Sequence, residues 1–294
     1  MEYVRNVQEG VEMGNKSEAI IEVKGAKKIY RMGSERICAV DNISFTVDQG
    51  EFCCLYGVSG SGKSTLLNLL AGIEKLTSGQ VIIKGKNIGR MSEKSLARFR
   101  QNNLGFVFQS YNLLGSMTAL ENVELPLVFK HLKSKKRKKM AKDILVKVGL
   151  GPRLKHKPKE MSGGQQQRVG IARAFVSNPE IVFADEPTGN LDSKTSKEVM
   201  DLIREMAKVN HQTIVMVTHD RRLAEYADKI IHIFDGKIEK IELKKEVELE
   251  EKSEAEEDNG ITQNIYDCEI AAAIEGNELK DNILKEDGGI CYEY

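Results

Sequence analysis

The sequence predicts an α/β protein in which a mostly parallel β-sheet is covered by helices on both faces. Two observations support this prediction. Apolar segments typical of buried strands alternate with helical segments through much of the chain, which is the pattern of parallel sheets. In addition, the segment GVSGSGKS at residues 57–64 lies between a strand-like and a helix-like segment, the context expected of a phosphate-binding loop.

The first third of the chain supplies several strands and one helix. Residues 1–18 are polar and patternless, and we expect them to form a flexible N-terminal arm. Strand-like segments follow, and the helix-like segment STLLNLLAGI continues directly from the phosphate loop. The predicted strands span residues 19–25, 39–48, 51–57 and 80–85, and the predicted helix spans residues 64–73.

The rest of the pattern alternates strands with helices, apart from one helical insertion. Between about Ser110 and Lys159 the segments are helical, and we expect an inserted helical subdomain at about residues 110–160. The main domain should then span residues 19–243, followed by a tail at residues 244–294. Strands are predicted at residues 104–109, 179–186 and 212–220, and a strand with a turn at residues 228–238. A helical stretch is predicted to begin at residues 119–132 and to continue through residues 138–150, and a further helix is predicted at residues 193–209.

The charges are unevenly distributed although the net charge is zero. Residues 246–294 contain 16 acidic and 3 basic residues, which leaves 28 acidic and 41 basic residues in the rest of the chain. We therefore expect a basic globular body with an acidic tail that is disordered and dispensable for catalysis.

Composition also limits the cellular context. No apolar run reaches the roughly 18 residues needed to cross a bilayer, and the first residues lack the apolar core of a signal peptide. The five cysteines show no metal-ligand spacing, and Cys53 and Cys54 should face opposite sides of a strand as reduced, packed thiols. We therefore expect a cytosolic protein.

The phosphate loop carries the first chemical signal. Its glycines allow backbone N–H groups to turn inward around phosphate oxygens, and the helix that begins near Gly62 adds its positive end. Lys63 can reach the outer phosphates, and Ser64 can offer its hydroxyl to Mg²⁺. The sequence therefore predicts a nucleotide site.

A second signal lies at the end of the strand-like segment IVFADE. Ligands bind at the carboxyl ends of parallel strands, where Asp185 and Glu186 stand. We expect Asp185 to hold Mg²⁺ and Glu186 to polarise the attacking water. The alternative is that both are surface acids that open the turn EPTGN.

Polar side chains also follow two other predicted strands. His219 comes just after the segment TIVMVT, and Gln109 comes just after LGFVF. His219 could contact the γ-phosphate or could be a packed residue. Gln109 could reach metal or water without adding charge.

Two further features allow more than one interpretation. Tyr30 lies ahead of the phosphate loop in what we interpret as a polar turn, where it could stack on a nucleobase or be partly buried.

Between Lys130 and Lys142 there are eight basic residues and no acid. This run could bind nucleic acid or anionic lipid, or could be a solvated helix face. Because no aromatic residue interrupts it, and the chain has no Trp, nucleic acid is not the partner that we expect.

The order and spacing of these motifs, together with MSGGQ at residues 161–165 and ADEPTGNLD at residues 184–192, resemble the ATP-binding subunit of an ABC transporter. The resemblance covers about residues 20–243. It implies a P-loop NTPase core with an antiparallel β subdomain and an inserted helical subdomain. It also implies ATP and Mg²⁺ as cofactors.

The resemblance implies a role for each matching position. Lys63, Gln109, Glu186 and His219 would be catalytic, with Glu186 as the base, and Ser64, Gln109 and Asp185 would bind the metal. Nucleotide contacts would come from Tyr30 stacked on adenine, from the Walker A loop (Gly57, Ser59, Gly60, Ser61, Gly62, Lys63, Ser64 and Thr65), from the signature motif (Ser162, Gly163, Gly164 and Gln165) and from Asp192 in the D-loop.

In this family the signature motif serves the ATP of a second subunit. Two subunits pack head to tail, so that each ATP lies between one Walker A loop and the partner's signature motif. Ser162 and the N–H groups of Gly163 and Gly164 would then form an anion site that closes on the γ-phosphate. The resemblance therefore implies an ATP-dependent dimer.

The segments FVFQSYNLLGSMTALENVELPL and DEPTGNLD resemble the branch that serves macrolide export (MacB-type), lipoprotein release and cell division (FtsE-type). Members of this branch work with a separate permease of the FtsX/MacB-like type, which implies a location on the inner face of the cell membrane. The branch suggests export of a lipid, peptide or drug-like substrate. This chain departs from the family pattern in Met161, in the absence of a proline in LLGSMT and in its acidic tail.

Two other functions remain open at this point. The chain could be an ATPase regulator of a cell-envelope or cell-division complex of the FtsE type. It could also be a DNA- or ribosome-associated ATPase that uses the basic run, although the second cassette, coiled-coil insert or zinc site usual in that class is not visible in the sequence.

Overall fold

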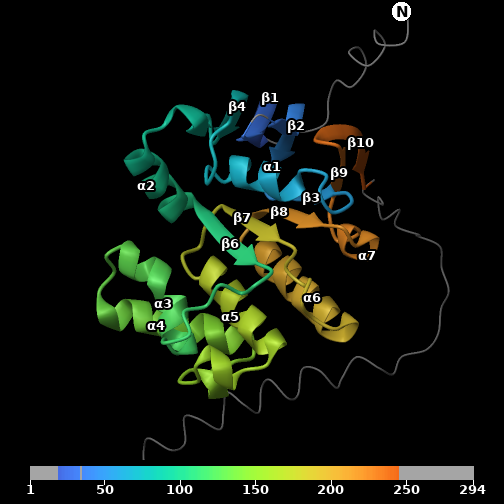
Figure 1. Ribbon diagram of the computed structural model, residues 1–294. Helices are drawn as coiled ribbons and strands as arrows, with labels where there is room; N and C mark the ends of the chain where they lie inside the picture. The colour runs from blue at the N-terminus through green and yellow to red at the C-terminus, as the bar shows by residue number, and fades with distance from the viewer. Residues whose placement is uncertain (1–18, 34, 245–294) are drawn as a thin grey trace, which may run out of the picture. The chain divides into compact units, whose positions relative to one another are not determined.

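The computed structural model describes residues 19–33 and 35–244 (Figure 1). The predictions of an N-terminal arm at residues 1–18 and of a disordered acidic tail lie outside the described residues. The described part contains a four-stranded sheet with strand order β2-β1-β4-β5 and a six-stranded sheet with strand order β10-β9-β3-β8-β7-β6. No helix in this part is long and apolar enough to cross a membrane.

The four-stranded sheet is antiparallel throughout. It consists of β1 (Ala19–Met32), β2 (Glu35–Asp48), β4 (Ser78–Ile83) and β5 (Lys86–Asn87). The first strand was predicted to end at Gly25, but β1 continues because its pairing with β2 shifts register on both sides of Ala26 and then resumes. Tyr30 therefore lies in a strand, and its interpretation as a turn residue was wrong.

The six-stranded sheet carries the predicted parallel core. β9, β3, β8, β7 and β6 are parallel, and only the edge strand β10 runs antiparallel. The strands are β3 (Phe52–Tyr56), β6 (Leu104–Phe108), β7 (Ile181–Asp185), β8 (Thr213–Thr218), β9 (Lys229–Phe234) and β10 (Lys237–Leu243). The turn predicted near residue 235 joins β9 to β10.

Helices cover both faces of this sheet, because alternate strand residues point to opposite sides. Cys53 and Leu55 of β3 pack with α1 (Lys63–Leu70) and α2 (Glu93–Asn103). Cys54 packs instead with α5 (Gly163–Phe175), α6 (Ser193–Val209) and α7 (Arg221–Ala224). Figure 1 shows α1 on one side of the six strands and α5 and α6 on the other. The opposite orientations predicted for Cys53 and Cys54 are confirmed.

The helical insertion is built from α3 (Ala119–Phe129) and α4 (Ser134–Lys147), which share a core with the outer side of α5. Short 3₁₀ helices follow at Gly151–Arg153 and Pro158–Glu160, and another lies at Ile88–Arg90. Helix α2 was not predicted, because only Leu96 and Phe99 are buried on it and its other residues are polar or small. The boundaries of the helical subdomain remain a prediction.

One buried side chain organises the loop that leads into α3. Asn122 is fully buried, and its Oδ1 accepts a hydrogen bond from the backbone N–H of Leu114 at 2.8 Å. Its Nδ2 donates to the carbonyls of Leu114, Met117 and Thr118 at 3.0–3.2 Å. The amide thus adds hydrogen bonds to the backbone of residues 114–118, where the Leu114 and Thr118 carbonyls also accept from the N–H groups of Met117 and Asn122.

Replacing Asn122 with Ala should therefore destabilise the fold by about 3 kcal/mol, since the hydrogen bonds between this buried amide and the loop backbone would be lost and a cavity would remain. Denaturant unfolding of the two proteins measures this difference. Asn210→Ala serves as the control, because exposed Asn210 makes one side-chain hydrogen bond to the Met206 carbonyl, and its loss should cost about 0.5 kcal/mol or less. Equal effects of the two substitutions would contradict the assignment.

Candidate active site

The phosphate loop connects β3 to α1 and is held against neighbouring backbone. Gly60 and Gly62 have φ values of 80° and 95°, in the left-handed region that favours glycine. A Cβ on Gly62 would lie 2.1 Å from the Ala39 carbonyl oxygen, and one on Gly57 would lie 2.2 Å from that of Ile233. Gly62 caps α1 without a side-chain hydrogen bond. The loop can therefore follow this path only with glycine at these positions, and it offers the N–H groups of a helix N-terminus to an anion.

Lys63 is buried in the loop with its ammonium group turned back onto it. Its Nζ donates to the Val58 carbonyl at 2.5 Å and lies 3.4 Å from the Ser61 hydroxyl. Burial lowers the pKa of Lys63, while the charges of Glu186 and Asp185 oppose this shift. The Lys63 ammonium group thus lies between the phosphate loop and the carboxylates of Glu186 and Asp185.

Asp185 ends β7 and contacts the first turn of α1. Its Oδ1 accepts a hydrogen bond from the Ser64 hydroxyl at 3.0 Å. Burial raises the pKa of Asp185, and the Ser64 hydrogen bond opposes this shift. A hydroxyl and a carboxylate oxygen, next to a loop that can hold phosphates, form the small oxygen ligand set that Mg²⁺ takes from proteins. The two residues that the sequence analysis assigns to Mg²⁺ are thus in contact, and their role as metal ligands stays a prediction.

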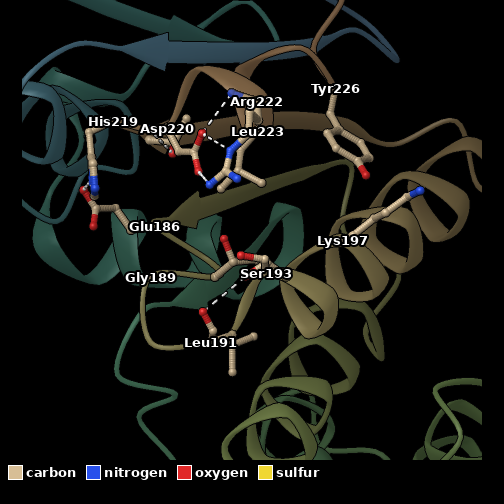
Figure 2. Close-up of a pocket in the computed structure, with 13 residues that line it drawn as sticks. Glu186, Gly189, Leu191, Ser193, Lys197, His219, Asp220, Arg222, Leu223 and Tyr226 are labelled. Atoms are coloured by element: carbon tan, nitrogen blue, oxygen red, sulfur yellow. Dashed lines mark hydrogen bonds and ion pairs between the residues drawn. The ribbon is translucent and has the colours of Figure 1, made fainter.

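Glu186 and His219 form a pair beside the ends of β7 and β8. The His219 Nδ1 lies 2.9 Å from the Glu186 Oε1 (Figure 2). Glu186 has a φ of 44°, which is uncommon for a residue with a side chain and indicates local backbone strain. Its N–H donates to the Val217 carbonyl at 3.1 Å, which holds this conformation against β8. The His219 side chain is 59% exposed, so it is not the packed residue of the alternative interpretation.

Gln109 follows β6, which is the neighbour of β7 in the sheet. Its backbone carbonyl accepts a hydrogen bond from the Asn190 side chain at 3.0 Å. Its side-chain amide lies so close to Gly189 that a Cβ on that glycine would be 2.5 Å from the Gln109 Nε2. The Gln109 amide is therefore held against the loop that follows Glu186.

Tyr30 is anchored at its hydroxyl group. The hydroxyl donates to a carboxylate oxygen of Glu74, and the Lys28 ammonium lies 4.9 Å from the centre of the Tyr30 ring. Burial raises the pKa of Tyr30, the Glu74 hydrogen bond raises it further, and a hydrogen bond with Thr65 lowers it. The contact with Thr65 connects Tyr30 to the helix that begins at the phosphate loop.

The signature motif lies on the other face of the sheet, at the start of α5. Ser162 caps this helix: its Oγ accepts from the Gln165 N–H at 3.3 Å, and the Gln165 side chain accepts from the Ser162 N–H at 3.1 Å. A Cβ on Gly164 would lie 2.7 Å from the Thr195 side chain, and one on Gly163 would lie 2.8 Å from the Tyr111 hydroxyl. The two glycines thus pack closely against these side chains, which would have to shift to admit a Cβ.

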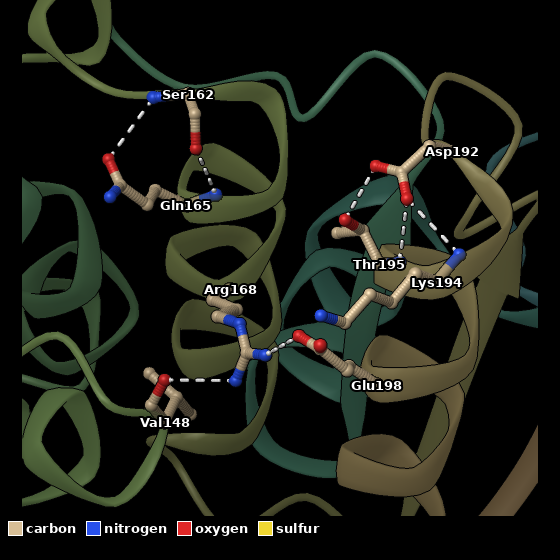
Figure 3. Close-up of polar contacts among 8 residues, drawn as sticks. All are labelled: Val148, Ser162, Gln165, Arg168, Asp192, Lys194, Thr195 and Glu198. Carbon is tan, nitrogen blue, oxygen red and sulfur yellow. Dashed lines mark hydrogen bonds and ion pairs between the residues drawn. The ribbon is translucent and has the colours of Figure 1, made fainter.

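Asp192 caps α6 next to the signature motif. Its carboxylate accepts hydrogen bonds from the N–H groups of Lys194 and Thr195 and from the Thr195 hydroxyl (Figure 3). A surface hollow of about 450 Å³ lies between the starts of α5 and α6. Its lining residues are Ser162, Gly163, Gly164, Gln165, Arg168, Asn190, Leu191, Asp192, Thr195 and Glu198, and none of them belongs to the phosphate loop.

The predicted site residues thus form two groups. The first, near the carboxyl edge of the parallel strands, contains Lys63, Ser64, Asp185, Glu186 and His219. The second surrounds the hollow between α5 and α6. Because α1 and α5 pack on opposite faces of the sheet, the two helix N-termini belong to different faces.

Sequence reasoning missed two residues that hold the signature helix in place. Buried Gln167 donates from Nε2 to the carbonyl of Pro187, next to Glu186, at 2.5 Å, and so connects the two groups. Arg168 forms an ion pair with Glu198 of α6 at 2.9 Å and donates to the Val148 carbonyl at 3.4 Å (Figure 3). The available signal was a polar residue at the helical position of a core residue, since Gln167 lies four positions before buried Ile171.

Comparison with known proteins identifies the family. The family model of the ABC transporter matches residues 40–189. An uncharacterised ABC transporter ATP-binding protein of Thermotoga maritima is 47% identical over 223 residues, which cover 76% of this chain and 95% of the relative. The macrolide export ATP-binding/permease protein MacB of Hyphomonas neptunium is 45% identical over 219 residues, which cover 74% of this chain and only 34% of the relative. The chain therefore spans about a third of the length of MacB.

A solved structure agrees with the sequence comparisons. The dimeric post-hydrolysis structure of the ATP-binding cassette MJ0796, bound to ADP and phosphate, matches with a TM-score of 0.72 at 42% identity. The match covers 76% of this chain and 98% of that structure. The motif order, the fold and these relatives agree, and the chain belongs to the ABC transporter family as an ATP-hydrolysing ATP-binding cassette.

Proposed function

We propose that this chain is the ATPase subunit of an exporter, in which two copies dimerise on ATP and drive a separate membrane permease of the FtsX/MacB-like type. The similarity to MacB supports export, and the dimeric cassette structure supports the dimer. The observation that carries the proposal is the separation of the phosphate loop and the signature motif onto opposite faces of one sheet. The cargo would be a lipid, a peptide or a drug-like molecule.

The site residues divide the catalytic work as follows. Backbone N–H groups of the phosphate loop and the Lys63 ammonium hold the phosphates of ATP. Ser64, Asp185 and Gln109 would hold Mg²⁺, which offsets the negative charge of the transferred phosphoryl group. Glu186 accepts a proton from the attacking water, and His219, hydrogen-bonded to Glu186, fixes the orientation of that carboxylate and faces the γ-phosphate. The Tyr30 ring stacks on adenine.

The second half of each site comes from the partner subunit. Its Ser162 and the N–H groups that follow at the start of α5 would close on the γ-phosphate. The adjacent Asp192 loop would lie at the same interface, because it borders the same hollow. This arrangement would follow from the fold, because one chain presents the N-termini of α1 and α5 on different faces of the sheet. The signature motif of one chain would then serve the ATP bound by the other chain.

An apolar groove of about 940 Å³ is a suitable place for the permease to dock. It lies between α2, β6, α3 and α5 and includes Phe106, Phe108, Val128 and Phe129. Phe129 is 62% exposed, and Ile73 and Val128, which line the same groove, are exposed as well, so that these side chains form an apolar patch. A cytoplasmic segment of a permease in this groove would hold the cassette on the inner face of the membrane.

Glu186→Gln should retain ATP binding, lose about 100-fold or more in turnover and accumulate an ATP-bound dimer, because the amide cannot accept the proton from water. Phosphate release and size-exclusion chromatography with ATP measure the two effects. Glu205→Gln is the matched control, since Glu205 is exposed on α6. Turnover by Glu186→Gln close to that of the control would remove Glu186 from the role of base.

Two inactive variants should restore activity when mixed. Lys63→Ala removes the phosphate-binding ammonium, and Ser162→Arg places a bulky side chain at the signature motif. In mixed dimers one site combines the intact Lys63 of one chain with the intact Ser162 of the other, so that an equimolar mixture should recover up to about a quarter of wild-type ATPase activity. Differential tags confirm that mixed dimers form. If they form and remain inactive, the shared-site arrangement is wrong.

A further inference from the structure

One face of α4 carries four lysines at helical spacing. Lys135, Lys138, Lys139 and Lys142 follow one another at intervals of three, one and three residues, which places them on one side of the helix. All four are exposed, whereas the opposite side of the helix buries Ala141 and Leu145 in the core shared with α3 and α5. We refer to these four residues as the lysine face.

The lysine face is unfavourable for the isolated helix. Like charges three and four residues apart repel one another. The first turn of α4 contains no acidic residue, so Lys135 also lies near the positive end of the helix dipole. Within residues 19–33 and 35–244 none of the four ammonium groups forms an ion pair. In the described part of the chain, no ion pair therefore offsets the repulsion among these four lysines.

Acidic residues nearby do not neutralise this face. Asp143 lies four residues after Lys139, which is the less favourable order for such a pair, and the two form no ion pair. Glu121 is held by hydrogen bonds from Thr118, which lower its pKa, and Lys138 adds a smaller effect through its charge. The carboxylate of Glu124 is paired with Arg137 on the side of the helix that faces the core.

The position of α4 links this face to the apolar groove. Helices α3 and α4 lie side by side (Figure 1), and four residues separate the end of α3 at Phe129 from the start of α4 at Ser134. Val128 and Phe129 line the groove that we propose as the permease docking site. If a permease occupies that groove, the α3–α4 turn lies close to the bilayer, and the lysine face begins in the first turn of the next helix.

We propose that the lysine face binds the anionic phospholipid headgroups of the membrane in which the permease is embedded. This inference rests on the proposed permease partnership for the source of the membrane, and on charge complementarity for the contact itself. An anionic headgroup layer would neutralise the four charges that repel one another within the chain. The contact would fix the orientation of the helical region when the groove is occupied.

The residue types favour lipid over nucleic acid. Lysine is a mobile point charge on a long apolar stem, which suits a fluid layer of headgroups. Single-stranded nucleic acid is usually bound with aromatic residues for base stacking, and α4 contains none. Its one arginine, Arg137, is engaged with Glu124. Duplex DNA can still be tested as a competing ligand of the same surface.

Vesicle cosedimentation of the full chain without a permease tests the proposal. We expect binding to vesicles of phosphatidylcholine with 30% phosphatidylglycerol, little binding to phosphatidylcholine alone, and a decrease with rising salt. Each lysine near an anionic surface contributes about fivefold in affinity. Replacing all four with Gln should therefore weaken binding by roughly tens- to several hundredfold, with no loss of thermal stability and unchanged ATPase activity in solution.

A control with the same change in net charge separates the face from the overall charge. Lys86, Lys94, Lys155 and Lys208 are exposed and scattered over the chain, and their replacement with Gln should reduce vesicle binding only slightly. The proposal is overturned if the wild-type chain does not prefer anionic vesicles, or if both quadruple variants lose binding equally. It is also overturned if the face variant loses affinity for duplex DNA but keeps vesicle binding.

The result of the vesicle experiment does not depend on whether the chain is the subunit of an exporter. The vesicles contain no permease, so a failure of lipid binding leaves the ATPase and dimer tests unchanged. Conversely, a chain that binds anionic vesicles through the lysine face but is not recruited by any permease would support this inference and contradict the exporter proposal.

Discussion

Parallel pairing of the central strands is the constraint on which the site depends. Parallel strands all end at one edge, so the loops that follow β3, β6, β7 and β8 meet there. This edge carries Lys63, Gln109, Glu186 and His219 although they are far apart in the sequence. The hydrogen bond from Ser64 to Asp185 joins two of these loops directly.

Burial of both faces of the same sheet also determines where the helix N-termini lie. Side chains alternate between the two faces, so α1 packs on one face and α5 and α6 pack on the other. Each helix N-terminus can bind an anion, but the two are presented on different sides of the sheet. In the proposed dimer one chain would therefore supply complementary halves of two sites, which gives a physical reason for dimerisation.

Two residues with positive φ lie where the chain leaves these strands. Glu186 adopts a left-handed conformation directly after β7, and Gly62 reaches the start of α1 with a φ of 95°. The surroundings hold both positions: Glu186 donates to the Val217 carbonyl, and Gly62 packs on the Ala39 backbone. Buried Gln167 holds the next residue, Pro187, from the signature helix. The catalytic loop is thus fixed from both faces of the sheet.

Much of this arrangement could be predicted from the sequence, because buried strands and glycine-rich turns have strong local signals. The alternation at Cys53 and Cys54 followed from periodicity, and the positions of the phosphate loop before α1 and of Asp185 at the end of β7 followed from motif context. Helix α2 was missed because its burial depends on two residues, and Tyr30 was misassigned because register shifts extend β1 beyond Gly25. Helical spacing could place Gln167 on the buried side of α5, but its contact lies 20 residues away and has no local signal in the sequence.

Site-directed cross-linking tests the shared site most directly. Val58 is 61% exposed in the phosphate loop, and Ser162 opens the signature helix. A Glu186→Gln chain with Val58→Cys and Ser162→Cys, in a background without Cys38, Cys268 and Cys291, would be oxidised with and without ATP. The account predicts an ATP-dependent covalent dimer. A cross-link formed within single chains, leaving monomers on a non-reducing gel, would contradict it.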